Sequence, residues 1–557
     1  MAETDCSLAL GSPRFSDARL ATLARDRGDL AAWQASVSEN AGQAAAGVTG
    51  DFAVGLRTPG GRTFLAVDRF AIRTLCYRVL NGQLHFAPRA NELADADTPI
   101  DPQAIFDYLY FHVIPSPRTI YRGVHRLPPG HYAIFENNQL TVASYWAPTF
   151  DDHRDATFAS LKDEFRHLLR DAVATQIDGN RAACFLSGGT DSSTVAGMAA
   201  LASKHKVSTY SIGFDAQGYD EMAFARVAAK HFQTEHHEYY VTPNDLVRSI
   251  PDVAAHYDQP FGNSSALPAY YCAKVAHENG ARKLLAGDGG DELFGGNARY
   301  AKQRVFGWYD RVPAVLKSRV MDPLLRTHAA TALALTRKAA SYVEQARVPM
   351  PDRLQMYNLI LRLGVREVLT PAMLAQIDAS LPLQLQREVW QAAGGCSQLN
   401  QELAFDWRFT LAESDLPKVA GATAMAGVGV GFPLLDHRLL TFSLKLPTQY
   451  KLKGLTLRWF FKEALRGFLP DEIIRKKKQG FGLPFGVWAN THPALKALAT
   501  DSLHSLVRRG VVRGDFVQRL LSQRLQEHPG YFGEMVWILM MLEQWLAARA
   551  PQFTMAH

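Results

Sequence analysis

The sequence has few cysteines and no excess of one charge, and each absence argues against a class of protein. Its five cysteines in 557 residues are odd in number, widely scattered and without a C-x-x-C pair, which argues against a disulfide scaffold or a zinc ribbon. Lysine plus arginine number 60 and aspartate plus glutamate 54, a net charge of +6 that does not indicate nucleic-acid binding. We therefore expect a cytoplasmic protein with reduced thiols and no nucleic-acid partner.

Long hydrophobic segments are also missing. The longest fully apolar run covers residues 535–542 and ends at Glu543, so it is too short to cross a bilayer and predicts a buried helix. The first residues lack the basic and apolar regions of a signal peptide. We expect a globular protein without a membrane partner, since the composition is 47% hydrophobic and 20% charged.

Two patterns of secondary structure meet near residue 148. Residues 50–148 contain short alternating runs, with turn residues at 59–61 and 81–82, which predict strands and hairpins. Beyond them, predicted helices alternate with strands at 182–186, 207–214, 238–241 and 283–286. This alternation predicts a parallel, doubly wound sheet, with ligands at the carboxyl ends of its strands. We therefore divide the chain into domains 1–148 and 149–557, and expect residues 300–545 to be mostly helical.

A glycine-rich segment, Ser-Gly-Gly-Thr-Asp-Ser-Ser at 187–193, follows a predicted strand and opens a helix. Glycines admit close approach of a ligand, and N–H groups at a helix start can hold an anion. The chain contains no G-x-x-x-x-G-K-[ST] sequence, which disfavours a Walker-type phosphotransferase. Asp191 would repel a phosphate unless a divalent cation lay between them. The alternative is a turn that only caps the helix.

A second glycine-rich segment at 287–296 also follows a predicted strand and carries Asp288, Asp291 and Glu292. Two acidic loops at the same edge of a sheet could share a metal-bound triphosphate. Either loop alone could equally be an acidic surface loop.

Both segments resemble known signatures. Residues 187–193 resemble the pyrophosphate loop of the ATP-pyrophosphatase superfamily, and residues 287–296 resemble the second signature of the asparagine synthetase family. Further segments that match lie at 211–221, 257–265, 433–436 and 475–481. The resemblance implies an α/β protein, with an N-terminal Ntn-hydrolase-like α+β domain and a C-terminal doubly wound ATP-pyrophosphatase domain that ends in a helical part.

The family adenylates a carboxylate with ATP, releases pyrophosphate, and lets an amine attack the acyl-adenylate. By resemblance, the residues that contact ATP are Leu186, Ser187, Gly188, Gly189, Asp191, Ser192, Ser193, Ile212 and Gly287. Asp191 and Asp291 match the family's Mg²⁺ ligands, and Lys478 matches the lysine that neutralises phosphate charge. The catalytic residues are then Lys478 and Asp291. In this interpretation Lys476 and Lys477 are solvated. Otherwise the whole run 475–478 could be a solvated basic face.

The N-terminal part resembles only the second portion of the family's class II glutamine amidotransferase domain, at 50–54, 67–77 and 121–130. Such domains use an N-terminal cysteine, but Ala2 follows the initiator methionine here and Cys6 could become terminal only by processing. The family's oxyanion and glutamine-binding segments are not recognisable before residue 50, where residues 7–49 suggest helices. We therefore expect a shortened, degenerate domain without glutaminase activity, and Cys6 as an unreactive surface thiol.

Charged residues of the family are also missing near the acceptor substrate. An acid and an arginine that precede the family's Pro-Phe-Leu-Asp segment align with Gly429 and Gly431, and the acid is implicated in proton removal. The family's Lys-Val-Asp-Arg segment reads Lys-Val-Ala-Gly at 418–421. We expect conserved activation chemistry on a different substrate, with the replacement for the missing base unidentified.

Three functions remain open. The first is an ATP-dependent, amide-forming ligase that joins a small-molecule or peptide carboxylate to an amine or ammonia without glutamine, as β-lactam synthetases and lasso-peptide cyclases do. The second is a glutamine-hydrolysing asparagine synthetase. The third is a nucleotide-binding scaffold without turnover, against which Asp191, Asp291 and Lys478 argue. A homodimer is left open.

Overall fold

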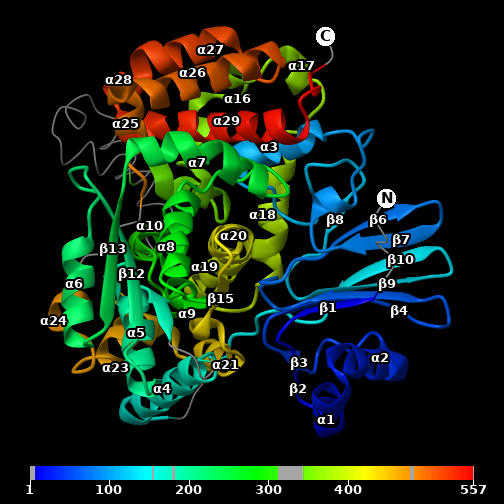
Figure 1. Cartoon of the computed structure of the whole chain (residues 1–557), viewed down its shortest axis with the longest axis vertical. Helices are drawn as coiled ribbons and strands as arrows, with labels where there is room; N and C mark the ends of the chain where they lie inside the picture. The colour runs from blue at the N-terminus through cyan, green and yellow to red at the C-terminus, as the bar shows by residue number, and fades with distance from the viewer. Residues whose placement is uncertain are drawn as a thin grey trace.

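The computed structural model describes residues 7–152, 156–177, 182–310, 342, 344–476 and 482–555 (Figure 1). Cys6 and Lys478 lie outside these residues. In Figure 1 an N-terminal domain of antiparallel strands lies beside a larger part that contains the parallel sheet and most helices. The α/β class predicted from the sequence is therefore confirmed, and both parts have the expected type of sheet.

The N-terminal domain contains one five-stranded antiparallel sheet in the order β1-β4-β5-β9-β10. Its strands are β1 (Leu8–Gly11), β4 (Phe52–Arg57), β5 (Thr63–Val67), β9 (His131–Glu136) and β10 (Gln139–Ser144). A three-stranded sheet contains β6 (Cys76–Leu80), β7 (Gln83–Ala87) and β8 (His125–Arg126), and helix α3 spans Pro102–Phe111. The hairpins predicted at 59–61 and 81–82 are confirmed as the turns between β4 and β5 and between β6 and β7.

The helical interpretation of residues 7–49 is only partly right. Helices α1 (Ala18–Arg27) and α2 (Asp29–Asn40) are present, but residues 8–11 form the edge strand β1. Pairing with β4 determines this strand, and a four-residue run has no periodicity from which to predict it. Helix α2 covers the sheet with Trp33, whose ring lies 5.3 Å from that of Phe15 and 5.1 Å from that of Phe52.

The second sheet is parallel, with the order β13-β12-β11-β14-β15. Its strands are β11 (Ala183–Phe185), β12 (Ser208–Phe214), β13 (Glu235–Val241), β14 (Lys283–Leu285) and β15 (Gly429–Gly431). The intervening helices are α4 (Phe158–Ala174), α5 (Thr190–Ala202), α6 (Met222–His231), α7 (Pro243–His256) and α8 (Ala266–Glu278). The strand order grows outward in both directions from β11 and β14, so the switch point where such sheets bind ligands lies between these two strands.

Helices dominate the described residues of the remaining chain, as predicted. They include α9 (Gly290–Phe294), α10 (Ala298–Asp310), α18 (Leu381–Ala392), α19 (Gln398–Asp406), α20 (Leu416–Met425), α21 (His437–Lys445), α23 (Trp459–Ala464), α24 (Asp471–Arg475), α25 (Phe485–Thr491), α26 (Pro493–Arg508) and α29 (Pro529–Arg549). A π-helical segment, η4 (Trp407–Asp415), joins α19 to α20. The buried run 535–542 lies inside α29, as predicted, and none of the helices described could cross a membrane.

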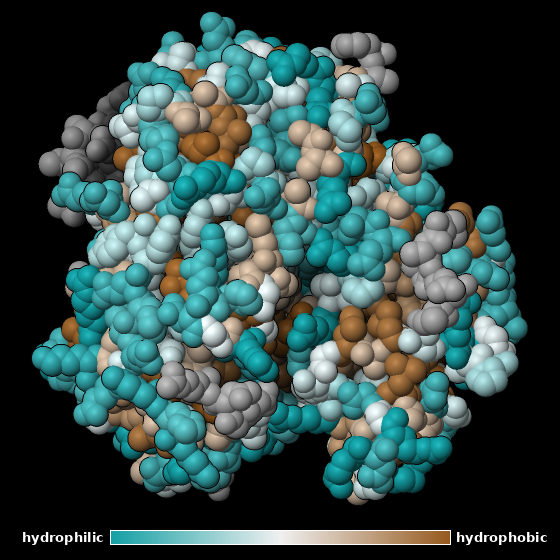
Figure 2. Space-filling view, in the orientation of Figure 1, coloured by the Kyte–Doolittle hydropathy of each residue, from teal (hydrophilic) through white to brown (hydrophobic). Residues whose placement is uncertain are grey.

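The two domains pack closely together. The rings of Phe70 and Trp146 lie 6.0 and 6.4 Å from that of Trp407 in η4. Figure 2 shows the surface hollowed at the junction of the domains. A cavity of about 920 Å³ lies there, lined by the amino ends of the parallel strands and by residues of the N-terminal domain. The N-terminal domain therefore contacts the second domain directly through η4.

Candidate active site

The first glycine-rich loop connects β11 to α5, at the carboxyl edge of the sheet. The Leu186 N–H donates to the carbonyl of Tyr210 at 2.9 Å, which continues the strand pairing up to the loop. Gly188 has a φ of +69°, and a Cβ there would lie 2.7 Å from the Cβ of Phe224, so only glycine fits. The hydroxyls of Ser187 and Ser192 lie 3.0 Å apart across the loop. The N-terminus of α5 and two hydroxyls therefore surround one point, as an anion site requires.

The second loop follows β14 and lies directly against the first. A Cβ on Gly287 would lie 2.7 Å from the backbone nitrogen of Ser192, so the two loops can approach only because this residue is glycine. Helix α9 then begins at Gly290 and carries Asp291 and Glu292 in its first turn. The topology of the sheet thus brings together two loops that are about a hundred residues apart in sequence, as the strand pattern predicted.

A buried arginine joins the acids of the two loops. The Arg458 Nη1 lies 2.5 Å from Oδ1 of Asp191 and 3.0 Å from Oδ1 of Asp291. Burial would lower the pKa of Arg458, but these two carboxylates raise it above its ordinary value, so the guanidinium stays charged. Two carboxylates that share one cation inside a cavity form a site that could also accept a metal-bound phosphate. Arg458 was not predicted as a site residue, because no feature of its local sequence distinguishes it from other arginines.

The loops open into a cavity of about 700 Å³, a volume suited to a nucleotide. The predicted residues that line it are Leu186, Ser187, Gly189, Asp191, Ser192, Ile212, Gly287 and Asp291. Gly188 lies behind the loop against α6, and Ser193 is fully buried within α5, so neither is part of the wall. Ile212 lies on β12 beside the loops, where the resemblance places the adenine. Lys478 lies outside the described residues.

The expectation that Lys476 is solvated is wrong. Its Nζ lies 2.8 Å from Oε1 of Glu221, and only 9% of its side chain is exposed. The same Nζ lies 3.4 Å from the carbonyl of Gly188 in the first loop and 4.6 Å from the centre of the Phe224 ring. Lys476 therefore contacts the phosphate loop and also lines the cavity into which the loop opens. Its partner Glu221 is 255 positions away, so a local sequence pattern could not reveal this contact.

In the lining of the same cavity, one lysine lies between two acids. The Lys418 Nζ is 2.9 Å from Oδ1 of Asp415 and 3.4 Å from Oδ1 of Asp288. Burial raises the pKa of Asp288, and Lys418 opposes that rise. Burial would lower the pKa of Lys418, but the two acids raise it. This acid–lysine–acid group was not predicted, although Asp288 and Lys418 belong to segments that the sequence analysis singled out.

The positions of the missing family residues differ from expectation. Gly429 and Gly431 line the interdomain cavity at the amino side of the sheet, not the cavity of the two loops. An acid at 429 would therefore not reach an acceptor bound near Asp415. Gly421 does lie near Lys418, in the same helix α20, and a Cβ there would be 2.7 Å from Cζ of Tyr257. The Tyr257 ring thus fills the space of a side chain at 421.

Metal binding and thiol chemistry are each limited by what the described residues provide. No group of three or more histidine, cysteine, aspartate or glutamate side chains suited to a metal is present among them. Asp191 and Asp291 alone fit Mg²⁺, which commonly takes one or two carboxylates together with phosphate oxygens. In the described part of the N-terminal domain the cysteine is Cys76, which is fully buried, and burial raises the pKa of its thiol.

Comparison with known proteins agrees with this geometry. A family model described as asparagine synthase matches residues 164–547, and one described as a glutamine amidotransferase domain matches residues 29–146. Asparagine synthetase [glutamine-hydrolyzing] 1 of Bacillus subtilis is 24% identical over 489 residues, which cover 86% of this chain and 74% of that protein. Putative asparagine synthetase [glutamine-hydrolyzing] 2 of Methanocaldococcus jannaschii is 29% identical over 46% of this chain and 51% of its own length.

A further relative is named as a different kind of enzyme, an amidase. Amidase chyE of Penicillium rubens is 23% identical over 504 residues, which cover 79% of this chain and 71% of that protein. The matched asparagine synthase region contains both glycine-rich loops, Arg458 and the group around Lys418. The chain therefore belongs to the asparagine synthase family and is an ATP-dependent, amide-forming carbon–nitrogen ligase with an N-terminal glutamine amidotransferase domain.

Proposed function

We propose that the protein adenylates a carboxylate with MgATP, releases pyrophosphate, and transfers the acyl group to an amine or ammonia without hydrolysing glutamine. The observation that carries this proposal is the pair Asp191 and Asp291, which come from both loops and share the buried cation Arg458. In this interpretation residues 149–557 form the ATP-binding domain and residues 1–148 a scaffold. The carboxylate is a small molecule or a peptide.

The chain's own groups supply most of the adenylation site. The Ser187 and Ser192 hydroxyls and the N–H groups at the start of α5 hold the pyrophosphate portion of ATP. Asp191 and Asp291 hold Mg²⁺, which when bound neutralises phosphate charge. Arg458 then faces the phosphates, where a fixed cation stabilises the pyrophosphate leaving group more than it stabilises bound ATP. Lys478 adds a second cation in this proposal.

The acid–lysine–acid group serves the acceptor side. An amine that attacks the acyl-adenylate must lose a proton, and Asp288 or Asp415 can accept it. Burial raises the pKa of Asp288, which makes that carboxylate a stronger base than an exposed one. Lys418 keeps both carboxylates oriented through its contacts at 2.9 and 3.4 Å. We propose this group in place of the base that was sought at Gly429.

The alternative is a glutamine-hydrolysing asparagine synthetase. It is favoured by the names of two relatives, which are both called glutamine-hydrolyzing asparagine synthetases. The buried thiol of Cys76 argues against it, because a nucleophilic cysteine must be accessible and ionisable. Helices α1 and α2 also occupy the region where the family's glutamine-binding segments are expected. Cys6 is then the remaining thiol of this domain, and its removal decides the question.

Exchange of radiolabelled pyrophosphate into ATP tests the proposal. The purified protein is incubated with Mg²⁺, ATP, labelled pyrophosphate and one candidate carboxylate at a time, including aspartate. Exchange that depends on a carboxylate other than aspartate, with no glutamate formed from glutamine, is the expected result. Exchange with aspartate followed by glutamine-dependent asparagine formation would establish the alternative. Binding of MgATP without exchange for any carboxylate would support a scaffold.

A further inference from the structure

The segment that carries the acceptor-side acids is π-helical and fixed at both of its ends. At its start, the Trp407 indole N–H donates to the carbonyl of Glu292 in the second loop at 2.9 Å. At its end, Asp415 contacts Lys418, which is the third residue of α20. A π-helix is rare and is frequently found at functional sites. Additional support for η4 comes from the other domain.

Glu413 of η4 accepts hydrogen bonds from the N-terminal domain. Its carboxylate, 3% exposed, lies 2.5 Å from Nη2 of Arg126 and accepts from both the N–H and the hydroxyl of Ser116, at 3.1 and 2.7 Å. Arg408, also in η4, contacts the same carboxylate and donates to the carbonyl of Ser116 at 2.5 Å. Burial alone would raise the pKa of Glu413, but Arg408 and Arg126 lower it, so the carboxylate is charged.

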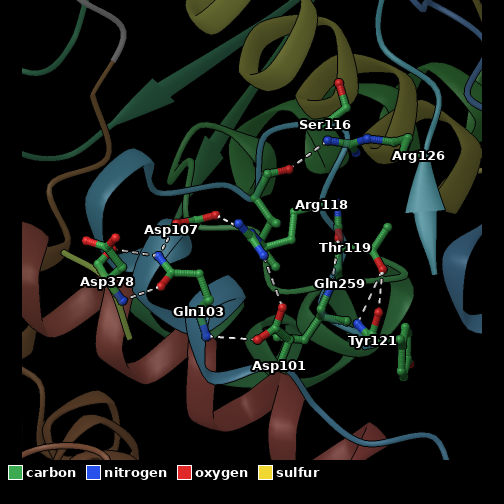
Figure 3. A network of polar contacts seen from close by, with 12 residues as sticks. Asp101, Gln103, Asp107, Ser116, Arg118, Thr119, Tyr121, Arg126, Gln259 and Asp378 are labelled. Atoms are coloured by element: carbon green, nitrogen blue, oxygen red, sulfur yellow. Dashed lines mark hydrogen bonds and ion pairs between the residues drawn. The ribbon is translucent and has the colours of Figure 1, made fainter. Parts of the chain in front are cut away.

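Arg126 is itself held in place within the N-terminal domain. Its Nη2 also donates to the carbonyl of Ile114 at 2.7 Å, and the residue is the last of β8. Figure 3 shows Arg126 and Ser116 at one end of this polar network. Arg118 lies in the middle of the view and contacts Asp101 and Asp107 at 3.3 and 2.8 Å, so its contacts with them remain inside the N-terminal domain.

We propose that Arg126 of the N-terminal domain is a positioning residue for the amide-forming half of the reaction. Through its buried ion pair with Glu413 it holds η4, and thereby sets where Asp415 and Lys418 lie in the cavity. This inference rests on the proposed function, because it takes Asp415 and Lys418 as acceptor-side groups. It gives the amidotransferase domain a role in this chain that does not depend on glutamine.

Hydrogen–deuterium exchange of the full-length protein, followed by mass spectrometry of peptides within 407–418, tests the proposal. In Arg126→Gln the exchange of these peptides should be roughly 10²-fold faster, because the buried Glu413 carboxylate loses one of its two arginine partners and the link between the domains, which favours local opening. Acetylation of Lys418 by an N-hydroxysuccinimide ester should also become faster. The affinity for MgATP, measured by calorimetry, should change less than about threefold, because Arg126 does not line that cavity.

Arg118→Gln is the matched control, since it removes a similar arginine from the same network without touching η4. It should leave residues 407–418 and Lys418 unchanged. Arg126→Lys keeps the charge but not the two directed bonds, and should give a smaller, roughly tenfold increase in exchange. This variant decides the question if the glutamine variant does not fold.

Unchanged exchange in either Arg126 variant that folds would overturn the proposal, as would an equal effect of Arg118→Gln. Exchange that rises over the whole chain, rather than over 407–418, would also overturn it. Neither readout requires turnover. Loss of the proposed function would instead appear as a wild-type protein that does not bind MgATP.

Discussion

Arg458 takes the place between the two acids that a divalent cation would occupy during turnover, and its replacement by methionine tests this assignment. Because the oxygens of Asp191 and Asp291 lie 2.5 and 3.0 Å from one nitrogen, they are at most about 5.5 Å apart, the sum of these distances. Two negative charges at that separation repel by about 3 kcal/mol at an effective dielectric constant of about 20. The variant should therefore be less stable by about this amount without metal.

Magnesium should compensate for the missing guanidinium. At about a hundredfold excess over its dissociation constant, a bound cation returns about 2.7 kcal/mol. Urea unfolding of the wild type and of Arg458→Met, each with and without Mg²⁺, measures both effects. Turnover should still fall roughly 10²–10³-fold, since one fixed charge on the leaving group is lost.

A matched control is available on the same stretch of chain. Arg466 forms an exposed pair with Glu463 at 2.7 Å, and such pairs contribute about 0–1 kcal/mol. Arg466→Met should therefore alter neither the stability nor its dependence on Mg²⁺. The reasoning is refuted if Arg458→Met is as stable as the wild type in the absence of metal, or if Mg²⁺ stabilises both proteins equally.

Four further predictions concern the site and its surroundings. Asp291→Asn should retain the fold by circular dichroism but lose Mg²⁺-dependent AMP formation, and wild-type-like AMP formation would contradict its assignment as a metal ligand. Incubation with glutamine should release no glutamate above a blank, whereas release that Cys6→Ala abolishes would establish a processed glutaminase. Lys476→Met should weaken ATP binding about tenfold in calorimetry, because a charge-assisted contact to the phosphate loop is lost. Burial lowers the pKa of Lys451 from 10.5 to about 7, so between pH 7 and pH 10 the unfolded chain binds a proton that the folded chain does not. The free energy of unfolding measured in urea should therefore rise from pH 7 towards pH 10. Lys451→Met should remove that rise.

The sequence was sufficient to predict the sheet and the meeting of its two loops. Short apolar runs followed by glycines predicted β11 and β14, and parallel pairing then brought residues 187–193 and 287–296 to the same edge. The capping box that starts α7 at Thr242 and Asp245 is a further signal of this local kind. Patterns within about ten residues, combined with the rules for parallel sheets, account for these successes.

Long-range contacts could not be predicted. Arg458 lies 167 positions beyond Asp291, and its pairing depends on how α23 returns to the loops. Lys476 was expected to be solvated because Lys478 was the residue that matched the family's lysine, yet its partner Glu221 belongs to another part of the fold. The expectation that Gly429 lies on the acceptor side was wrong for a different reason. Alignment on a neighbouring segment does not show which end of a strand a residue occupies.

The charges of the acid–lysine–acid group restrict which amine can bind beside it. Asp288 and Asp415 share Lys418, so this group carries a net negative charge and its one cation is already engaged. A free amino acid acting as the amine would bring a carboxylate that needs a cation of its own. Gly421 offers none, because Tyr257 fills the space beside it. An amine acceptor that carries no free carboxylate is therefore favoured electrostatically beside Lys418.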